Sequence, residues 1–130
     1  MFNPDIPDQC PPADALPANT TIYRQVNKLP ICEDHFLSHV EMKKGRYDPD
    51  NCEHWGCSVW VDKEGVEHAR SLIPHFRHTY ILSGDVDPSD GVIKHTPNQR
   101  QDRHYTFWKF FGHAISSKFE VALSPNEEWA

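Results

Sequence analysis

The chain has 130 residues, of which 38% are hydrophobic and 25% are charged, and its formal net charge is −6. This length allows a single domain with a modest core. No apolar run approaches the ~20 residues that a membrane-spanning helix needs, so the composition excludes a membrane protein. All of the net negative charge lies in residues 1–68. That distribution argues against nucleic-acid binding, which depends on clustered Lys and Arg.

Residues 1–19 are rich in proline, which favours extended backbone, so we expect an extended or disordered leader. The first residues have no basic start and no apolar stretch, and we therefore expect a cytoplasmic protein. The four cysteines form no tight paired framework, and in that compartment we expect free thiols. Disulfides, in any of three connectivities, are the alternative. The cysteines are Cys10, Cys32, Cys52 and Cys57.

Residues 20–123 form the predicted domain, followed by a tail at 124–130 that we expect to be frayed. Runs of β-branched and aromatic residues predict strands at 20–27, 55–62, 78–83, 91–96, 104–110 and 119–123. Apolar residues at helical spacing predict short helices at 33–40, 63–73 and 111–118.

The strand at 55–62 is expected to be central because both of its faces are mostly apolar. The strand at 91–96 is expected to pair with the one at 78–83 through the connection at 87–90. This element order predicts an α+β fold: one small domain with a mixed or mostly antiparallel sheet of about five to six strands and two to three short helices.

Three polar residues lie on predicted strands whose other residues are mostly apolar: Arg24, Ser58 and Glu120. Side chains alternate along a strand, so Arg24 shares a face with Ile22 and Val26. An arginine on a strand face that packs toward the core is costly to bury unless a carboxylate, backbone carbonyls or an anionic ligand pairs with its guanidinium. We therefore expect Arg24 either to pair internally, with Glu120 as the candidate, or to hold an anion.

Five histidines of the second half are candidates for acid–base chemistry, because histidine transfers protons near neutral pH. They are His75, His78, His95, His104 and His113. None lies in a recognised catalytic motif. His104 attracts most interest because the aromatic residues that follow it, Trp108 among them, could line a pocket.

The neighbouring pair Phe110 and Phe111 cannot both face the same side of one element, so one of them is expected to be exposed or near a pocket. Together with His104 and Trp108, these two residues are our candidates for a binding surface. Aromatic residues are enriched at protein interfaces.

Candidate metal ligands are Cys52, Cys57 and His54, and separately the pair His35 and His39. Zinc sites use two ligand pairs, each close in sequence. The second pair is missing here, so we assign no metal ligands. A zinc-stapled structural module stays an alternative.

The order Arg24, Ser58, Glu120 resembles the arginine, serine, glutamate pattern of ADP-ribosyltransferases. The resemblance implies a nicotinamide dinucleotide (NAD) as cofactor, with Arg24 on its phosphates, Ser58 ordering the site and Glu120 as the catalytic acid. The chain departs from the family in lacking a Ser-Thr-Ser run. It also has Lys118 where a second acidic residue is expected.

The wider spread of motifs, from Tyr23-Arg24 through Ser58-Val59 to His104 and Trp108, is similar to a group of short uncharacterised bacterial proteins. That resemblance implies a small bacterial cytoplasmic protein and no particular activity. The chain has no complete catalytic constellation, a Pro-rich arm and many aromatic residues for its size, and we therefore expect an accessory module that binds another protein and needs no cofactor. The NAD-using enzyme and the zinc-stapled module are the alternatives, and the oligomeric state is left open.

Overall fold

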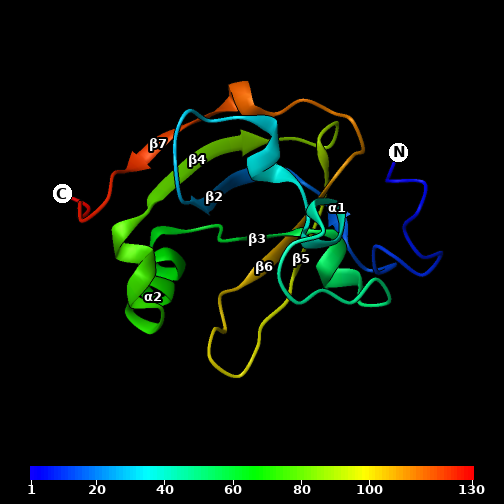
Figure 1. Ribbon diagram of the computed structural model, residues 1–130, viewed down its shortest axis with the longest axis horizontal. Coiled ribbons are helices and arrows are strands. Elements are labelled where there is room, and N and C mark those ends of the chain that lie inside the picture. The colour runs from blue at the N-terminus through cyan, green and yellow to red at the C-terminus, as the bar shows by residue number, and fades with distance from the viewer.

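The computed structural model describes residues 1–130 and contains seven strands in two antiparallel sheets. A four-stranded sheet has the order β1-β5-β6-β3, and a three-stranded sheet has the order β2-β4-β7 (Figure 1). The strands are β1 (Leu16–Pro17), β2 (Thr20–Val26), β3 (Cys57–Val59), β4 (Tyr80–Val86), β5 (Gly91–His95), β6 (Tyr105–Lys109) and β7 (Phe119–Leu123).

The two α-helices are α1 (His39–Met42) and α2 (Lys63–Leu72). Four short 3₁₀ turns complete the elements: η1 (Glu33–Phe36), η2 (Cys52–Trp55), η3 (Pro74–His78) and η4 (Ser116–Lys118). The fold is thus small and α+β, as the sequence predicts. It has more strands than expected, because residues 16–17 of the leader form β1. The seven strands are also divided between two sheets, where the sequence predicts one.

The strand predicted at 55–62 is not central. Only β3 forms there, and it lies at the edge of its sheet, paired with β6 alone. Residues 52–55 form the turn η2 instead, and Asp62 ends the extended run by capping α2 through a bond from the Gly65 amide. Trp60 then bridges to Tyr23 of β2, which links the two sheets.

The predicted pairing of residues 91–96 with 78–83 is also wrong. β4 pairs with β2 and β7, whereas β5 pairs with β1 and β6. The turn between β4 and β5 passes the chain from one sheet to the other. Buried Asp90 holds this turn by accepting bonds from the Asp87 amide and the Lys118 ammonium.

Two predicted helices are shorter than the sequence indicates. The helix at 33–40 is divided into η1 and α1, because Ser38 caps α1 by accepting a bond from the Glu41 amide. In the helix predicted at 111–118 only η4 forms. There Glu33 accepts bonds from the amides of Ile115 and Ser116, which holds the preceding loop against η1.

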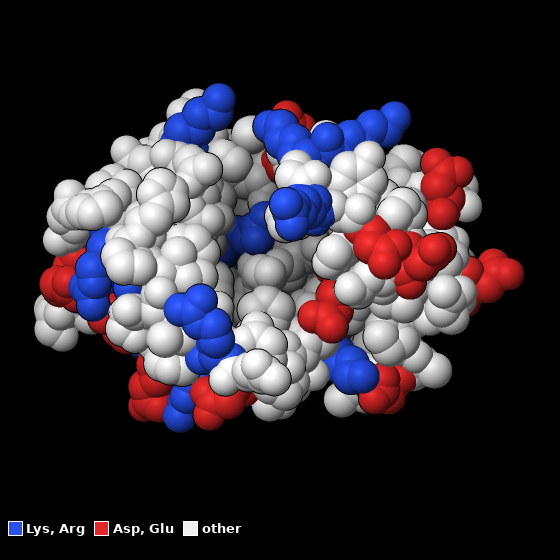
Figure 2. Space-filling model, turned by 60° about the horizontal axis from the view of Figure 1, so that its bottom comes forward, with Lys and Arg blue, Asp and Glu red and all other residues white.

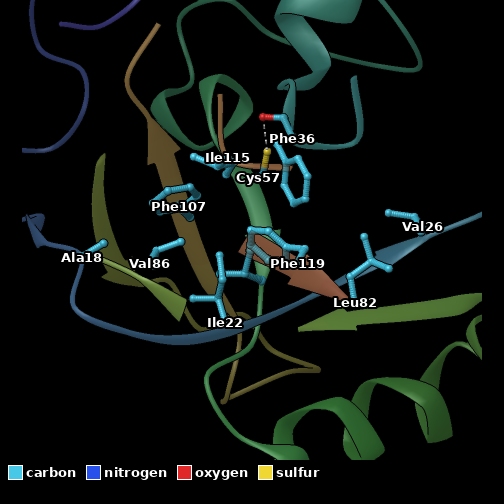
Figure 3. Close-up of a cluster of buried hydrophobic side chains, with 11 residues drawn as sticks. Ala18, Ile22, Val26, Phe36, Cys57, Leu82, Val86, Phe107, Ile115 and Phe119 are labelled. Atoms are coloured by element: carbon cyan, nitrogen blue, oxygen red, sulfur yellow. Dashed lines mark hydrogen bonds between the residues drawn. The ribbon is translucent and has the colours of Figure 1, made fainter. Parts of the chain in front are cut away.

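The main hydrophobic core lies between the two sheets (Figure 3). Ile22 and Leu82 enter it from the three-stranded sheet, and Cys57 and Phe107 enter it from the four-stranded sheet. The Cys57 thiol also donates to the Phe36 carbonyl oxygen at 3.0 Å. β2 and β3, which carry Arg24 and Ser58, are therefore anchored by buried neighbours on both sides of the polar residue.

A second cluster packs α2 against the outer face of the three-stranded sheet. Val66 and Ala69 of α2 meet Ile81 of β4 and Leu123 of β7. β4 therefore buries both of its faces, Leu82 toward the other sheet and Ile81 toward α2. Neither helix has the length and apolar character required to cross a bilayer.

Residues 1–19 lie along the domain, where Cys10 and Ala18 are buried. Cys10 forms a disulfide with Cys52, with Cα atoms 5.2 Å apart, so the expectation of four free thiols is wrong. The sequence separation of 42 between these cysteines means that local spacing does not indicate the pairing. Cys32 is a free, exposed thiol and Cys57 a free, buried one. At the other terminus, the Glu127 carbonyl accepts a bond from buried Arg70.

Candidate functional site

Arg24 lies in the middle of β2 and is half-buried, whereas Ile22 and Val26 on the same face are fully buried. Its Nε donates to the His35 carbonyl at 3.1 Å and its Nη1 donates to the Ser58 carbonyl at 3.0 Å. No carboxylate forms an ion pair with Arg24, although five other basic side chains of the chain have one. The guanidinium is thus fixed by neutral carbonyls and keeps its full positive charge.

Ser58 and His104 form a hydrogen-bonded pair between neighbouring strands. The Ser58 hydroxyl lies 2.9 Å from His104 Nε2. On the other side of the ring, Nδ1 lies 3.0 Å from the Thr96 carbonyl oxygen. A carbonyl oxygen only accepts hydrogen bonds, so Nδ1 carries the ring proton, and in the neutral ring Nε2 accepts from Ser58.

Arg24, Ser58 and His104 line one hollow of about 220 Å³, called here the inner hollow. Its other polar residues come from α1, η2, the loop before β6 and β6 itself: His39, Glu53, His54, Asn98 and Thr106. Glu53 is the one carboxylate in this set. A space-filling view shows one face of the molecule hollowed near its centre, with Lys or Arg atoms inside the hollow (Figure 2).

A second hollow of about 370 Å³, called here the outer hollow, adjoins the first. The two share Arg24 and His39 in their linings, so Arg24 lies at the junction between them. Lys44 adds a second positive charge to the outer hollow, and Asp34 adds a negative one. A ligand larger than either hollow can therefore extend to both sides of Arg24.

The electrostatics of the site favour neutral histidine rings near a positive guanidinium. Burial lowers the pKa of His104 below the ordinary histidine value, which outweighs the opposite effect of the Thr96 carbonyl. Burial, followed by the charge of Arg24, also lowers the pKa of His35 and of His39. His104 is therefore a neutral hydrogen-bond acceptor toward Ser58 at pH 7.

Glu120 is not part of this site. It is exposed on β7 opposite Ser83 of β4, which in turn lies opposite Tyr23 of β2. Residues directly opposite each other across antiparallel strands share a face, so Glu120 lies on the Tyr23 face and Arg24 on the other. The structure brings Arg24 and Ser58 together and places His104, not Glu120, beside them.

The aromatic candidates lie in three different environments. Trp108 is buried, and its indole N–H donates to the Cys52 carbonyl at 2.8 Å. Phe110 is half-buried with its ring 5.1 Å from that of Phe2. Phe111 is 54% exposed beside another hollow, which Lys109 and Leu37 help to line. Of the four binding candidates, only His104 lines the inner hollow.

No group of three or more His, Cys, Asp or Glu side chains is arranged to hold a metal ion. Cys52, one of the ligands weighed for zinc, is bonded to Cys10. His54 Nδ1 instead accepts a bond from the Asp48 amide, and His35 Nδ1 accepts one from the Cys32 amide.

Several lining residues had no role in the sequence-based hypothesis of the site. His39 and His54 were considered only as metal ligands, and Glu53 lies between Cys52 and His54 without a motif of its own. Asn98 enters through the loop before β6, which the sequence marks only as polar. Of these lining residues, only the histidines are indicated as site candidates by the sequence, because nine histidines is a high number for this length.

Searches of protein-family models, of curated protein sequences and of solved structures found no match to this chain.

Proposed function

We propose that this protein binds a nucleotide containing a diphosphate, of the NAD or ADP-ribose class, with the diphosphate on Arg24. The observation that carries the proposal is a fixed, half-buried guanidinium without a carboxylate partner at the junction of two hollows. Arginine binds phosphate through paired N–H donors, and Nη2 of Arg24 makes no hydrogen bond within the protein.

The dimensions of the site support a ligand of this kind. The inner hollow has room for a sugar or a small ring, and the outer hollow is larger. Small-molecule sites in proteins commonly span about 300–1,000 Å³. The outer hollow alone lies near the lower end of that range, and the two hollows together lie well within it. Ser58, Asn98 and Thr106 supply neutral polar groups that suit ribose hydroxyls.

An ADP-ribosyltransferase activity at this site would need a catalytic acid other than Glu120, the residue that the resemblance implies. Glu120 faces away from Arg24, so it is not available to a ligand there. Of the titratable groups that line the inner hollow, Glu53 is the one carboxylate and His104 is the histidine bonded to Ser58, and these two are the candidates to replace it. The proposal is therefore nucleotide binding, with any transfer or hydrolysis carried out by those residues.

Calorimetry with ADP-ribose, NAD and inorganic phosphate tests the proposal. We expect ADP-ribose and NAD to bind, and Arg24→Gln to weaken ADP-ribose binding at least 10-fold because it removes the charge. Arg100→Gln is the matched control, since Arg100 is an unpaired arginine in a separate polar hollow with His68 and Asp102. Absence of binding at millimolar nucleotide, or equal losses in both variants, would refute the site.

A second candidate function, binding of another protein, is favoured by the exposed ring of Phe111. A photo-reactive phenylalanine analogue at position 111, expressed in the native host, tests it. We expect one defined protein to be cross-linked from position 111 and not from Leu29, an exposed control. No cross-link beyond that of the control would remove this candidate.

The compartment is a further proposal that the thiols can decide. The sequence favours a bacterial cytoplasm, whereas the Cys10–Cys52 disulfide is typical of oxidising surroundings. Alkylation of the protein under denaturing conditions, as it is taken from cells, distinguishes the two because it also reaches the buried Cys57 thiol. Four modified cysteines support the cytoplasm, and two support an oxidising compartment.

A further inference from the structure

The hydrogen-bonded pair of Ser58 and His104 is the feature of the site that ligand binding alone does not explain. Ser58 is exposed on β3 between buried Cys57 and Val59, so its hydroxyl has no packing role there. A serine, a neutral imidazole that accepts its proton, and a third group that orients the imidazole are the parts of an activated nucleophile.

The orientation of His104 is determined on several sides. The Thr96 carbonyl accepts from Nδ1–H, and the Thr96 hydroxyl lies 2.9 Å from the same nitrogen. That hydroxyl also lies 2.8 Å from the hydroxyl of buried Thr106. Trp60 meets the imidazole edge to face, with ring centroids 6.3 Å apart. The ring is therefore held with Nε2 directed at Ser58.

We propose that Ser58 is a nucleophile toward phosphoryl groups, with His104 as its general base. As the Ser58 Oγ–phosphorus bond forms, the bond from phosphorus to the leaving group breaks, and that group departs with the electron pair. The hydroxyl proton moves to His104 Nε2 and then to solvent. The choice of a phosphoryl substrate depends on the proposed function, because it follows from the unpaired charge of Arg24. The activation of Ser58 does not depend on it.

An uncharged fluorophosphonate tests the activation of Ser58 without requiring an anion site. In this reaction fluoride is the leaving group, and the serine gains the phosphonyl group. We expect mass spectrometry of the full chain, followed by peptide mapping, to find the adduct on Ser58. Ser58→Ala removes the adduct, and His104→Gln slows its formation at least about 100-fold, as general-base catalysis implies. His75→Gln, an exposed histidine of η3, is the control and reacts at the rate of the unmodified chain.

The pH dependence of labelling separates a general base from a residue that only supports the fold. The rate is expected to fall as His104 becomes protonated at acidic pH and to be constant above neutrality. Burial lowers the pKa of His104, so the fall occurs below pH 6.5. The charged or titratable groups that face this ring are Arg24 from β2, His39 from α1, Glu53 and His54 from η2, and His95 from β5.

Three results would overturn the proposal: an unlabelled Ser58 in the folded chain, equal rates in the His104→Gln variant, or a rate that does not fall anywhere below pH 6.5 at which the chain is still folded. The pH profile needs no variant, so it decides the matter even where His104→Gln does not fold. If labelling succeeds while ADP-ribose does not bind, the nucleophile stands and the proposed ligand is wrong. If ADP-ribose binds and Ser58 is inert, the nucleophile alone is wrong.

Discussion

Arg24 has a structural role as well as the proposed binding role. Its two hydrogen bonds tie β2 to the carbonyls of His35 in η1 and Ser58 in β3. These carbonyls face a fixed cation, which makes the bonds stronger than neutral ones. The same side chain therefore shapes both hollows and remains charged for a ligand.

The stability of Arg24→Ala tests this structural role. Removing the guanidinium leaves two carbonyls without their donor, and we expect the free energy of unfolding to fall by about 1.5–3 kcal/mol. Chemical denaturation measures the change. Gln25→Ala on the same strand is the control, because the Gln25 side chain bonds only to nearby Asn27. A loss equal to that of the control would show that the carbonyl contacts add no stability.

His104 makes the stability of the fold depend on pH. Its pKa is lowered in the folded state by burial, so the unfolded chain binds the proton more tightly. The stabilising contribution is complete above pH 6.5 and is lost as the pH falls through 6.5 toward the folded-state pKa. Lowered carboxylate pKa values, such as about 2 for Asp87, act only at more acidic pH.

We therefore expect His104→Gln to reduce the dependence of unfolding free energy on pH below 6.5, leaving the part that comes from His35 and His39, whose pKa values are also lowered by burial. Denaturation curves at several pH values measure this slope. A slope in the variant equal to that of the unmodified chain would assign the pH dependence to other groups.

Among the elements, β4 is the strand on which the fold depends most. It pairs on both edges and buries both faces. At Gly84 the chain crosses close to η4 and the start of β7. A Cβ added there would lie 2.7 Å from the Lys118 carbonyl oxygen and 2.7 Å from the Phe119 ring. One neighbour is backbone, so the crowding cannot be relieved by a side-chain rotation alone.

Gly84→Ala is thus expected to lower the free energy of unfolding by about 1–3 kcal/mol, the usual effect of overpacking. Ser83→Ala, at the preceding position of the same strand, is the control and should change stability much less. Thermal unfolding compares them. Equal melting temperatures for the two variants would mean that β4 and β7 separate easily at this point.

The elements also show what local sequence patterns can and cannot predict. The patterns at β2 and α2 give nearly the right bounds, because alternation and helical spacing are local properties. The division into two sheets depends on long-range pairings of β4 and β5, which no local pattern encodes. Residue type alone makes Arg24, Ser58 and His104 candidates. That His104 and not Glu120 lies beside Arg24 and Ser58 depends on strand pairing and register, which the sequence does not show directly.

In the whole molecule, the Cys10–Cys52 disulfide joins the N-terminal arm to η2, which supplies Glu53 and His54 to the inner hollow. Closing a loop of 42 residues restricts the unfolded chain, by about 4 kcal/mol in the chain-entropy model. The arm is also held by β1 and by the bond from the Phe111 amide to the Met1 carbonyl.

Replacing both cysteines with serine is expected to lower the free energy of unfolding by about 2–4 kcal/mol. Reducing agent should shift the unmodified chain in the same direction and leave the double variant unchanged. Cys32→Ser is the control, since that thiol is free and exposed. A reductant-insensitive melting temperature would contradict the stabilising role of this bond.

The position of a bound nucleotide tests the assignment of the site most directly. A crystal structure of the full chain with ADP-ribose is expected to show a diphosphate oxygen within hydrogen-bonding distance of Arg24, with the two ends of the ligand in the inner and outer hollows. A ligand bound instead at the separate hollow of His68, Arg100 and Arg103, away from Arg24, would contradict the assignment.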